Sequence, residues 1–143
     1  MLVHVYVEVM NNMIGTVPSE LALLSELRDL DFSVNSLVGT VPNLSNLLSL
    51  EALSFGSNLM DGTIPEFLYS MNRLITIDLS DNSFTGTISS SVGRLSNLQS
   101  FFLWSNKLTS TIPPQLGDLK RLRKFDVIQF PFIILMTYII YSN

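Results

Sequence analysis

The sequence predicts an α/β repeat solenoid, built from about five to six stacked coils of 23–24 residues each. The first observation is a phrase that recurs five times, as NNMIGTVP, NSLVGTVP, NLMDGTIP, NSFTGTIS and NKLTSTIP. The second is its spacing, because the asparagines that open the phrase are 24, 23, 24 and 24 residues apart. They are Asn11, Asn35, Asn58, Asn82 and Asn106. A constant period of this length is typical of coils that pack only on their neighbours.

Apolar residues precede the later asparagines at a fixed spacing. Leu24, Leu27, Leu30 and Phe32 lie in the order LxxLxxLxLxxN, and the next three copies repeat this order. The combined pattern, LxxLxxLxLxxNxLxGxIPxxLxxL, resembles the plant-type leucine-rich repeat family over residues 11–127. The resemblance implies a right-handed horseshoe with a parallel β-sheet on its concave face. It also implies a second extended stretch around the GxIP segment and a loose helical turn on the convex side.

Each strand of the concave sheet is expected at a pair of apolar residues two positions apart. Side chains at this spacing point to the same face of a strand. The pairs are Leu30 and Phe32, Leu53 and Phe55, Ile77 and Leu79, and Phe101 and Leu103. Such a face is buried only when a neighbouring coil stacks on it, so one copy alone is not expected to fold.

The other recurring residues also have structural explanations. Buried backbone groups need partners, and the resemblance implies that the recurrent asparagines bond the adjacent turns as a ladder. Glycine accepts positive φ without strain, and Gly15, Gly39, Gly62 and Gly86 each follow an asparagine by four residues. Ser110 replaces this glycine in the fifth copy, and we expect Ser110→Gly to be neutral or stabilising by up to ~1 kcal/mol. The single 23-residue step places one missing residue in the surface loop after Pro42.

Composition restricts the functional classes. The net charge of −4 argues against a nucleic-acid partner, and the absence of cysteine excludes thiolate metal sites and thiol nucleophiles. His4 is the only histidine, so the sequence offers no catalytic triad, and its glycines form no phosphate loop. Asp29 and Asp31, or Asp78 and Asp81, could in principle bind a cation, but neither pair belongs to an alternating ligand loop that ends in a bidentate glutamate, so calcium is weakly supported. We therefore expect no enzymatic activity, no cofactor and no metal site.

The candidate binding surface is the predicted concave face, at strand positions not taken by core residues. One column across the strands is Asp31, Ser54, Asp78, Phe102 and Asp126, and the next is Ser33, Gly56, Ser80, Trp104 and Ile128. Exposed aromatic residues are typical interface anchors, so we expect a patch centred on Phe102 and Trp104 that binds a peptide or protein with basic groups. Its predicted residues are Phe102, Trp104, Asp78, Asp126, Ser80, Asp81 and Asp31. The alternative is that neighbouring structure covers Trp104.

The two ends depart from the repeat. Residues 1–10 are expected to form an irregular first strand or an incomplete N-terminal cap, residues 11–129 the solenoid, and residues 130–143 an apolar tail. The apolar run at 130–141 would span ~18 Å as a helix, against about 30 Å for a bilayer core, so it gives little support to membrane association. The first residues do not resemble a signal peptide, and we expect either an internal slice of a longer solenoid or an imperfectly bounded translation.

The leading functional hypothesis is non-enzymatic recognition of a protein or peptide through the concave face. One alternative is a fragment of the ectodomain of a receptor-like leucine-rich repeat membrane protein with a role in signalling. A second alternative is a leucine-rich repeat protein of the enzyme-inhibitor type. The resemblance implies an extracellular or membrane-associated location, and Asn43, in the triplet Asn-Leu-Ser, is a candidate glycosylation site. Fold alone does not decide between these functions.

Overall fold

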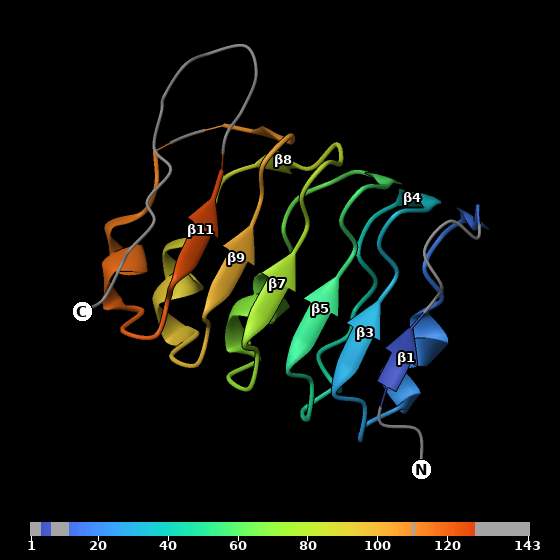
Figure 1. Ribbon diagram of the computed structural model, residues 1–143, viewed down its shortest axis with the longest axis horizontal. Coiled ribbons are helices and arrows are strands. Elements are labelled where there is room, and N and C mark those ends of the chain that lie inside the picture. Colours follow the sequence, from blue (N-terminus) through green and yellow to red (C-terminus); the bar gives the residue numbers. More distant parts are fainter. Residues whose placement is uncertain (1–3, 7–11, 110, 128–143) are drawn as a thin grey trace.

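One parallel sheet of six short strands dominates the computed structural model, which describes residues 4–6, 12–109 and 111–127 (Figure 1). The strands are β1 (His4–Tyr6), β3 (Asp29–Asp31), β5 (Ala52–Ser54), β7 (Thr76–Asp78), β9 (Ser100–Phe102) and β11 (Lys124–Asp126). They lie side by side in this order, so neighbouring strands come from consecutive coils. The predicted solenoid with a parallel sheet is confirmed.

A second set of short strands follows the recurrent asparagines. These strands are β2 (Ile14–Gly15), β4 (Ser36–Gly39), β6 (Leu59–Met60), β8 (Thr85–Gly86) and β10 (Lys107–Leu108). They form the groups β2-β4-β6 and β8-β10, and an isolated bridge joins Thr63 to Thr85. Their register is shifted along the repeat, because Val38 pairs with Leu59 and not with the equivalent Asp61. This is the second extended stretch that the resemblance implies.

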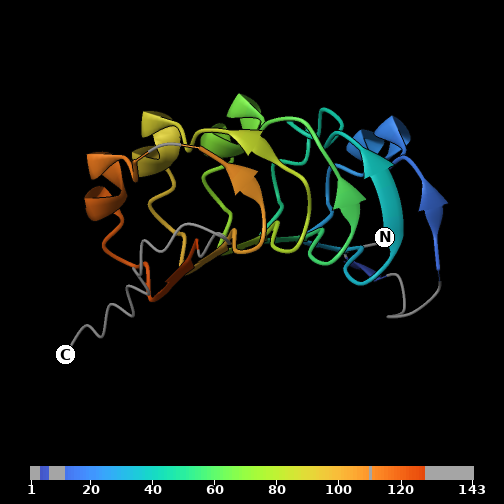
Figure 2. The ribbon, with the colours of Figure 1, turned by 90° about the horizontal axis from the view of Figure 1, so that it is seen from above.

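Four 3₁₀ helices line the side of the solenoid opposite to the six-stranded sheet (Figure 2). They are η1 (Ser19–Leu23), η2 (Glu66–Ser70), η3 (Ser90–Arg94) and η4 (Pro114–Asp118). The expected helical turns are thus 3₁₀ helices, and each begins directly after the proline position of the repeat. The shortened copy after Pro42 has turns in place of a helix. Leu44 there is fully buried, so the missing residue alters the loop and preserves the core contact.

The core is a stack of apolar side chains between the sheet and the 3₁₀ helices. In the six-stranded sheet, the middle residue of each strand after β1 is buried. These residues are Leu30, Leu53, Ile77, Phe101 and Phe125. The apolar residue two positions later is also buried in the first four of these coils, as Phe32, Phe55, Leu79 and Leu103. Rings from consecutive coils pack together, with the centroids of Phe32 and Phe55 6.1 Å apart. Each coil therefore buries its apolar pair against its neighbours.

Asparagine side chains bridge consecutive coils. The Oδ1 atom of Asn58 accepts the backbone N–H of Leu37 at 3.0 Å, and its Nδ2 group donates to the carbonyls of Phe32 and Phe55, both at 3.0 Å. Three further asparagines accept a backbone N–H of the preceding coil in the same way: Asn35, Asn82 and Asn106. Asn11 lies outside the described residues. These bonds satisfy backbone groups that coil stacking would otherwise bury unpaired.

The turn glycines have the left-handed conformation, with φ of 90° at Gly15, 79° at Gly39, and 80° at Gly62 and Gly86. At Gly62 the available space is limiting as well. A Cβ atom there would lie 2.7 Å from Cγ2 of Thr40 in the preceding coil. Ser110, the exception in the sequence, lies outside the described residues, so the effect of Ser110→Gly stays a prediction.

The first expected segment, residues 1–10, includes β1, which pairs in parallel with β3 and aligns Val5 with Leu30. The apolar tail at 130–143 lies outside the described residues. None of the helices in the described part of the chain has the length and apolar character needed to cross a bilayer.

Candidate functional site

Two columns of side chains flank the buried middle residues of the concave sheet. One column is Asp31, Ser54, Asp78, Phe102 and Asp126, and the pairing register aligns these residues strand by strand. The other column, at the first position of each strand, is Asp29, Ala52, Thr76, Ser100 and Lys124. This other column lies outside the site predicted from the sequence. The period of two could have revealed this column, because Asp29 and Asp31 point to one face of the strand and the buried Leu30 between them points to the other.

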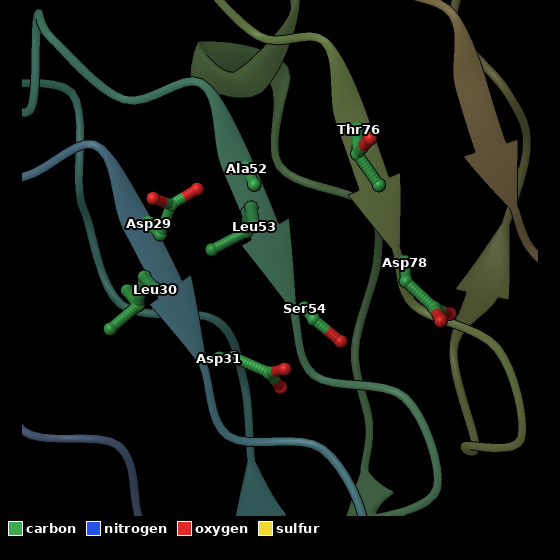
Figure 3. Close-up of a pocket in the computed structure, with 8 residues that line it drawn as sticks. All are labelled: Asp29, Leu30, Asp31, Ala52, Leu53, Ser54, Thr76 and Asp78. Carbon is green, nitrogen blue, oxygen red and sulfur yellow. The ribbon is translucent and has the colours of Figure 1, made fainter. Parts of the chain in front are cut away.

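The concave face has a hollow of about 270 Å³ over strands β3, β5 and β7. Strand β5 contributes the small side chains of Ala52 and Ser54 together with the core residue Leu53, whereas the strands beside it carry carboxylates (Figure 3). The lining residues are Asp29, Leu30, Asp31, Ala52, Leu53, Ser54, Thr76 and Asp78. None of these eight is basic. His4 on the neighbouring strand β1 bonds the Asp29 carboxylate, so Asp31 and Asp78 are the carboxylates that a cationic group entering this acidic hollow would meet.

Hydrogen bonds hold two of the carboxylates at the ends of their strands. Oδ1 of Asp78 accepts the backbone N–H of Ser80 at 2.9 Å and its hydroxyl at 2.6 Å. Oδ1 of Asp31 accepts the N–H of Ser33 at 2.9 Å in the same arrangement. These bonds offset part of the repulsion between the acidic residues, and they fix one oxygen of each carboxylate while the side chain still lines the hollow.

The structure corrects the role predicted for Ser80. This residue is only 2% exposed, and its hydroxyl donates to the Asp78 carboxylate. It orients Asp78 and is not part of the accessible surface. The neighbouring column position, Gly56, has a related effect. A Cβ atom there would lie within 3.0–3.1 Å of the Asp78 carboxylate atoms, so glycine leaves the space that this carboxylate occupies.

The two predicted aromatic residues lie beside the acidic hollow. Phe102 aligns with Asp78 on one side and Asp126 on the other, and it is half-buried. Trp104 is 37% exposed, so the described part of the chain does not cover it. Asp81 is exposed, and its Oδ1 accepts the hydroxyl of Ser105 at 3.3 Å. Aromatic and acidic groups therefore share one continuous stretch of the concave face.

Two further positions bear on chemistry outside this face. Asn43 is exposed in the shortened loop, and its Oδ1 accepts the backbone N–H of Ser45 at 3.1 Å. Tyr69 is a buried residue of η2, and burial raises the pKa of its hydroxyl to about 12. Its Oη accepts the N–H of Ser89 at 3.4 Å, which is a structural contact. Among the described residues there is no cluster of three histidine or acidic side chains that could hold a metal ion.

Parts of the chain are similar in sequence to known leucine-rich repeat proteins. The Leucine Rich Repeat family model matches residues 73–95 and 97–119. A stretch of 49 residues is 45% identical to an inactive leucine-rich repeat receptor-like serine/threonine-protein kinase of Arabidopsis thaliana. The match covers 34% of this chain and 8% of that protein.

Solved structures of plant receptors are similar over most of the chain. The plant peptide hormone receptor RGFR1, in complex with RGF2, matches with a TM-score of 0.80 and 38% identity. The match covers 82% of this chain and 19% of that receptor chain. The leucine-rich repeat ectodomain of the receptor kinase SOBIR1 from Arabidopsis thaliana matches with a TM-score of 0.77 and 31% identity, over 87% of this chain and 67% of that chain. The chain thus covers only 8% of the receptor-like kinase and 19% of the RGFR1 chain, but 67% of the SOBIR1 ectodomain chain.

Proposed function

The chain belongs to the plant-type leucine-rich repeat family, and on that premise we propose that it is a non-enzymatic module that recognises a peptide through its concave face. A similar structure, that of a plant peptide hormone receptor in complex with RGF2, supports a peptide as the class of ligand.

The observation that carries the proposal is the acidic hollow next to exposed aromatic side chains. A lysine or arginine of the ligand would enter the hollow between Asp31 and Asp78, where arginine can form charge-assisted hydrogen bonds. An apolar ligand residue would pack on Phe102 and Trp104, as aromatic anchors commonly do at interfaces. Asp126 and Asp81 flank the aromatic part of the same surface.

The sheet geometry predicts the spacing of these two ligand residues. Strands β5 and β9 are two positions apart in the sheet, which corresponds to about 10 Å. An extended peptide advances by about 3.4 Å per residue. The basic and the apolar residue are therefore expected about three positions apart in a peptide that runs across the strands.

Calorimetric titration with synthetic peptides tests this proposal. A peptide with arginine and leucine three positions apart should bind more tightly than one in which glutamine replaces the arginine. Trp104→Ala and Asp31→Asn should each weaken binding roughly tenfold, the loss expected for an interface anchor or a charged hydrogen bond. Asp61→Asn removes the same charge at an exposed position outside the hollow and serves as the control. Equal affinity for the arginine and glutamine peptides, together with unchanged binding by Trp104→Ala, would contradict the proposal.

A second candidate is that this module is part of a receptor-like ectodomain. The likeness to the SOBIR1 ectodomain, of which the chain covers 67%, favours it. The concave face would then be extracellular, and Asn43 would be an accessible site for glycosylation. Mass spectrometry of the protein after secretion from plant cells tests this candidate, because a glycan on Asn43 requires passage through the secretory pathway. An unmodified Asn43 in secreted protein would count against it.

A further inference from the structure

We propose that a second recess, at the edge of the concave sheet where strands β5, β7 and β9 begin, binds an oxyanion such as a carboxylate or a sulfate group. The recess has a volume of about 290 Å³. It is lined by Glu51, Arg73, Ile75, Asn97, Gln99 and Arg121. These six residues lie outside the predicted concave patch.

The repeat itself brings the two arginines to the same recess. Arg73, Asn97 and Arg121 occupy equivalent positions in consecutive coils, each directly before a buried leucine. Both arginines are exposed. They lie two coil steps apart, which is about 10 Å at the spacing of neighbouring strands. An anion between them is within reach of both long side chains.

Hydrogen bonds orient one side of this arrangement. Nη1 of Arg121 donates to Oδ1 of Asn97 at 2.6 Å, and Nδ2 of Asn97 donates to the backbone carbonyl of Asn72 at 2.8 Å. The guanidinium of Arg121 is therefore held by a side chain that is itself anchored to the backbone. A guanidinium has five N–H donors in a planar fork, so most of its donors stay available for a ligand.

The charges around the recess are unbalanced. Glu51 is its only acidic lining residue, and this carboxylate already pairs with Arg28 at 3.3 Å. Within the described part of the chain, Arg73 has no ion pair or hydrogen bond. Two guanidinium groups thus face one recess without a carboxylate of their own. Arginine forks match the oxygen spacing of carboxylate and sulfate groups, which identifies the class of ligand.

This inference goes beyond peptide recognition in the hollow. Glu51 and Ile75 line the recess, and their chain neighbours Ala52 and Thr76 line the acidic hollow. The two sites are therefore adjacent but have opposite charge. A small anion can bind the recess even if no peptide binds the hollow. An experiment that contradicts peptide binding therefore leaves the proposal of anion binding intact, and the reverse is also true.

Nuclear magnetic resonance titration of the full chain tests the recess without a peptide. Sodium sulfate and sodium acetate are added in separate series, with sodium chloride holding the ionic strength constant. We expect saturable shifts of the Nε–H signals of Arg73 and Arg121 and of the side-chain amide of Asn97. A response to sulfate alone would identify a tetrahedral oxyanion, and a response to acetate alone would identify a carboxylate.

Matched variants locate the binding. Arg73→Gln and Arg121→Gln should each weaken anion binding roughly tenfold, the effect of losing one charged hydrogen-bonding partner. Arg94→Gln removes the same charge from the exposed end of η3 and should leave the affinity unchanged. Thermal melts verify that each variant is folded. Wild-type shifts no larger than those in chloride, or an equal loss of binding in Arg94→Gln, would overturn the proposal.

Discussion

Val34 has a backbone conformation that β-branched residues rarely adopt. Its φ is 57°, in the left-handed region, and Ser57, Asp81 and Ser105 have φ of 55°, 50° and 53° just before their own asparagines. The left-handed conformation costs an L-residue roughly 1–2 kcal/mol, and aspartate and asparagine tolerate it best. The repeat therefore demands this conformation at a position where the second copy carries an unsuitable side chain.

We expect Val34→Asn to raise the free energy of unfolding by about 1 kcal/mol, because asparagine lowers the cost of the left-handed backbone. The Val34 side chain is 41% exposed, so its replacement sacrifices little apolar burial. Urea denaturation measures the change. Val38→Asn is the matched control, since Val38 is 42% exposed but is not among the residues with positive φ. An equal gain in the control would show that the backbone of Val34 is not the cause.

At the scale of the structural element, the recurrent glycine at or just after the end of strands β2, β4, β6 and β8 can meet two separate demands, one on its backbone conformation and one on the space around it. Gly62 combines a φ of 80° with a position where a Cβ atom would lie 2.7 Å from Thr40. Gly15 has a φ of 90°, but no atom lies within 4 Å of its Cβ position. Gly117, in η4, has neither restriction. The three positions therefore separate the conformational cost of a side chain from its steric cost.

Alanine substitution at these three positions should give a graded result. Gly62→Ala is expected to lower the free energy of unfolding by about 2–4 kcal/mol, from the left-handed backbone together with the clash. Gly15→Ala should cost only the backbone part, about 1–2 kcal/mol. Gly117→Ala should be neutral or slightly stabilising, because alanine restricts the unfolded chain. Urea denaturation of the three variants gives the order, and an equal loss at Gly15 and Gly62 would exclude the contact with Thr40.

The contact between η2 and η3 predicts a loss of stability at high pH. Burial raises the pKa of Tyr69 from 10.0 to about 12; the nearby Glu66 charge also raises it, and the hydrogen bond from Ser89 lowers it. A raised pKa means that the unfolded chain loses its phenolic proton first. The stability linked to this group is complete below pH 10 and is lost as the pH rises to 12, by roughly 2–3 kcal/mol. Denaturation at several pH values measures the loss, and Tyr69→Phe should lack this part of it.

The repeat made the order of the strands and helical turns predictable. The acidic hollow, the burial of Ser80 and the register of the second strands depend on side-chain sizes and strand pairing between coils, which the residue type at one position does not reveal. Five in-register asparagines and the LxL pairs placed the sheet strands, because period-two burial leaves one register that buries every pair. The acidic hollow escaped prediction since it arises from small side chains on β5 between larger ones on both sides. Ser80 is buried and bonded to Asp78, which its position in the strand pattern did not predict. The shifted register of the second strands had no signal in the sequence.

At the scale of the whole molecule, the solenoid is a one-dimensional stack. Each strand of the six-stranded sheet pairs only with the strands of the preceding and following coils. Stability in such a stack is the sum of the coil stabilities and the interfaces between neighbours. A change in a central coil therefore weakens two interfaces, whereas a change in a terminal coil weakens one.

Leu53→Ala tests this coupling in the centre of the stack. Leu53 is fully buried and aligns with Leu30 and Ile77 in the neighbouring coils. The cavity is expected to cost about 2–5 kcal/mol, and native-state hydrogen exchange should show the largest loss of amide protection in β3, β5 and β7. Protection in β11, three coils away from β5, should change least, because the stack transmits the loss only through successive interfaces. Leu48→Ala, at a side chain that is 75% exposed, should leave protection nearly unchanged. A uniform loss across all six strands would instead show that the coils unfold as one cooperative unit.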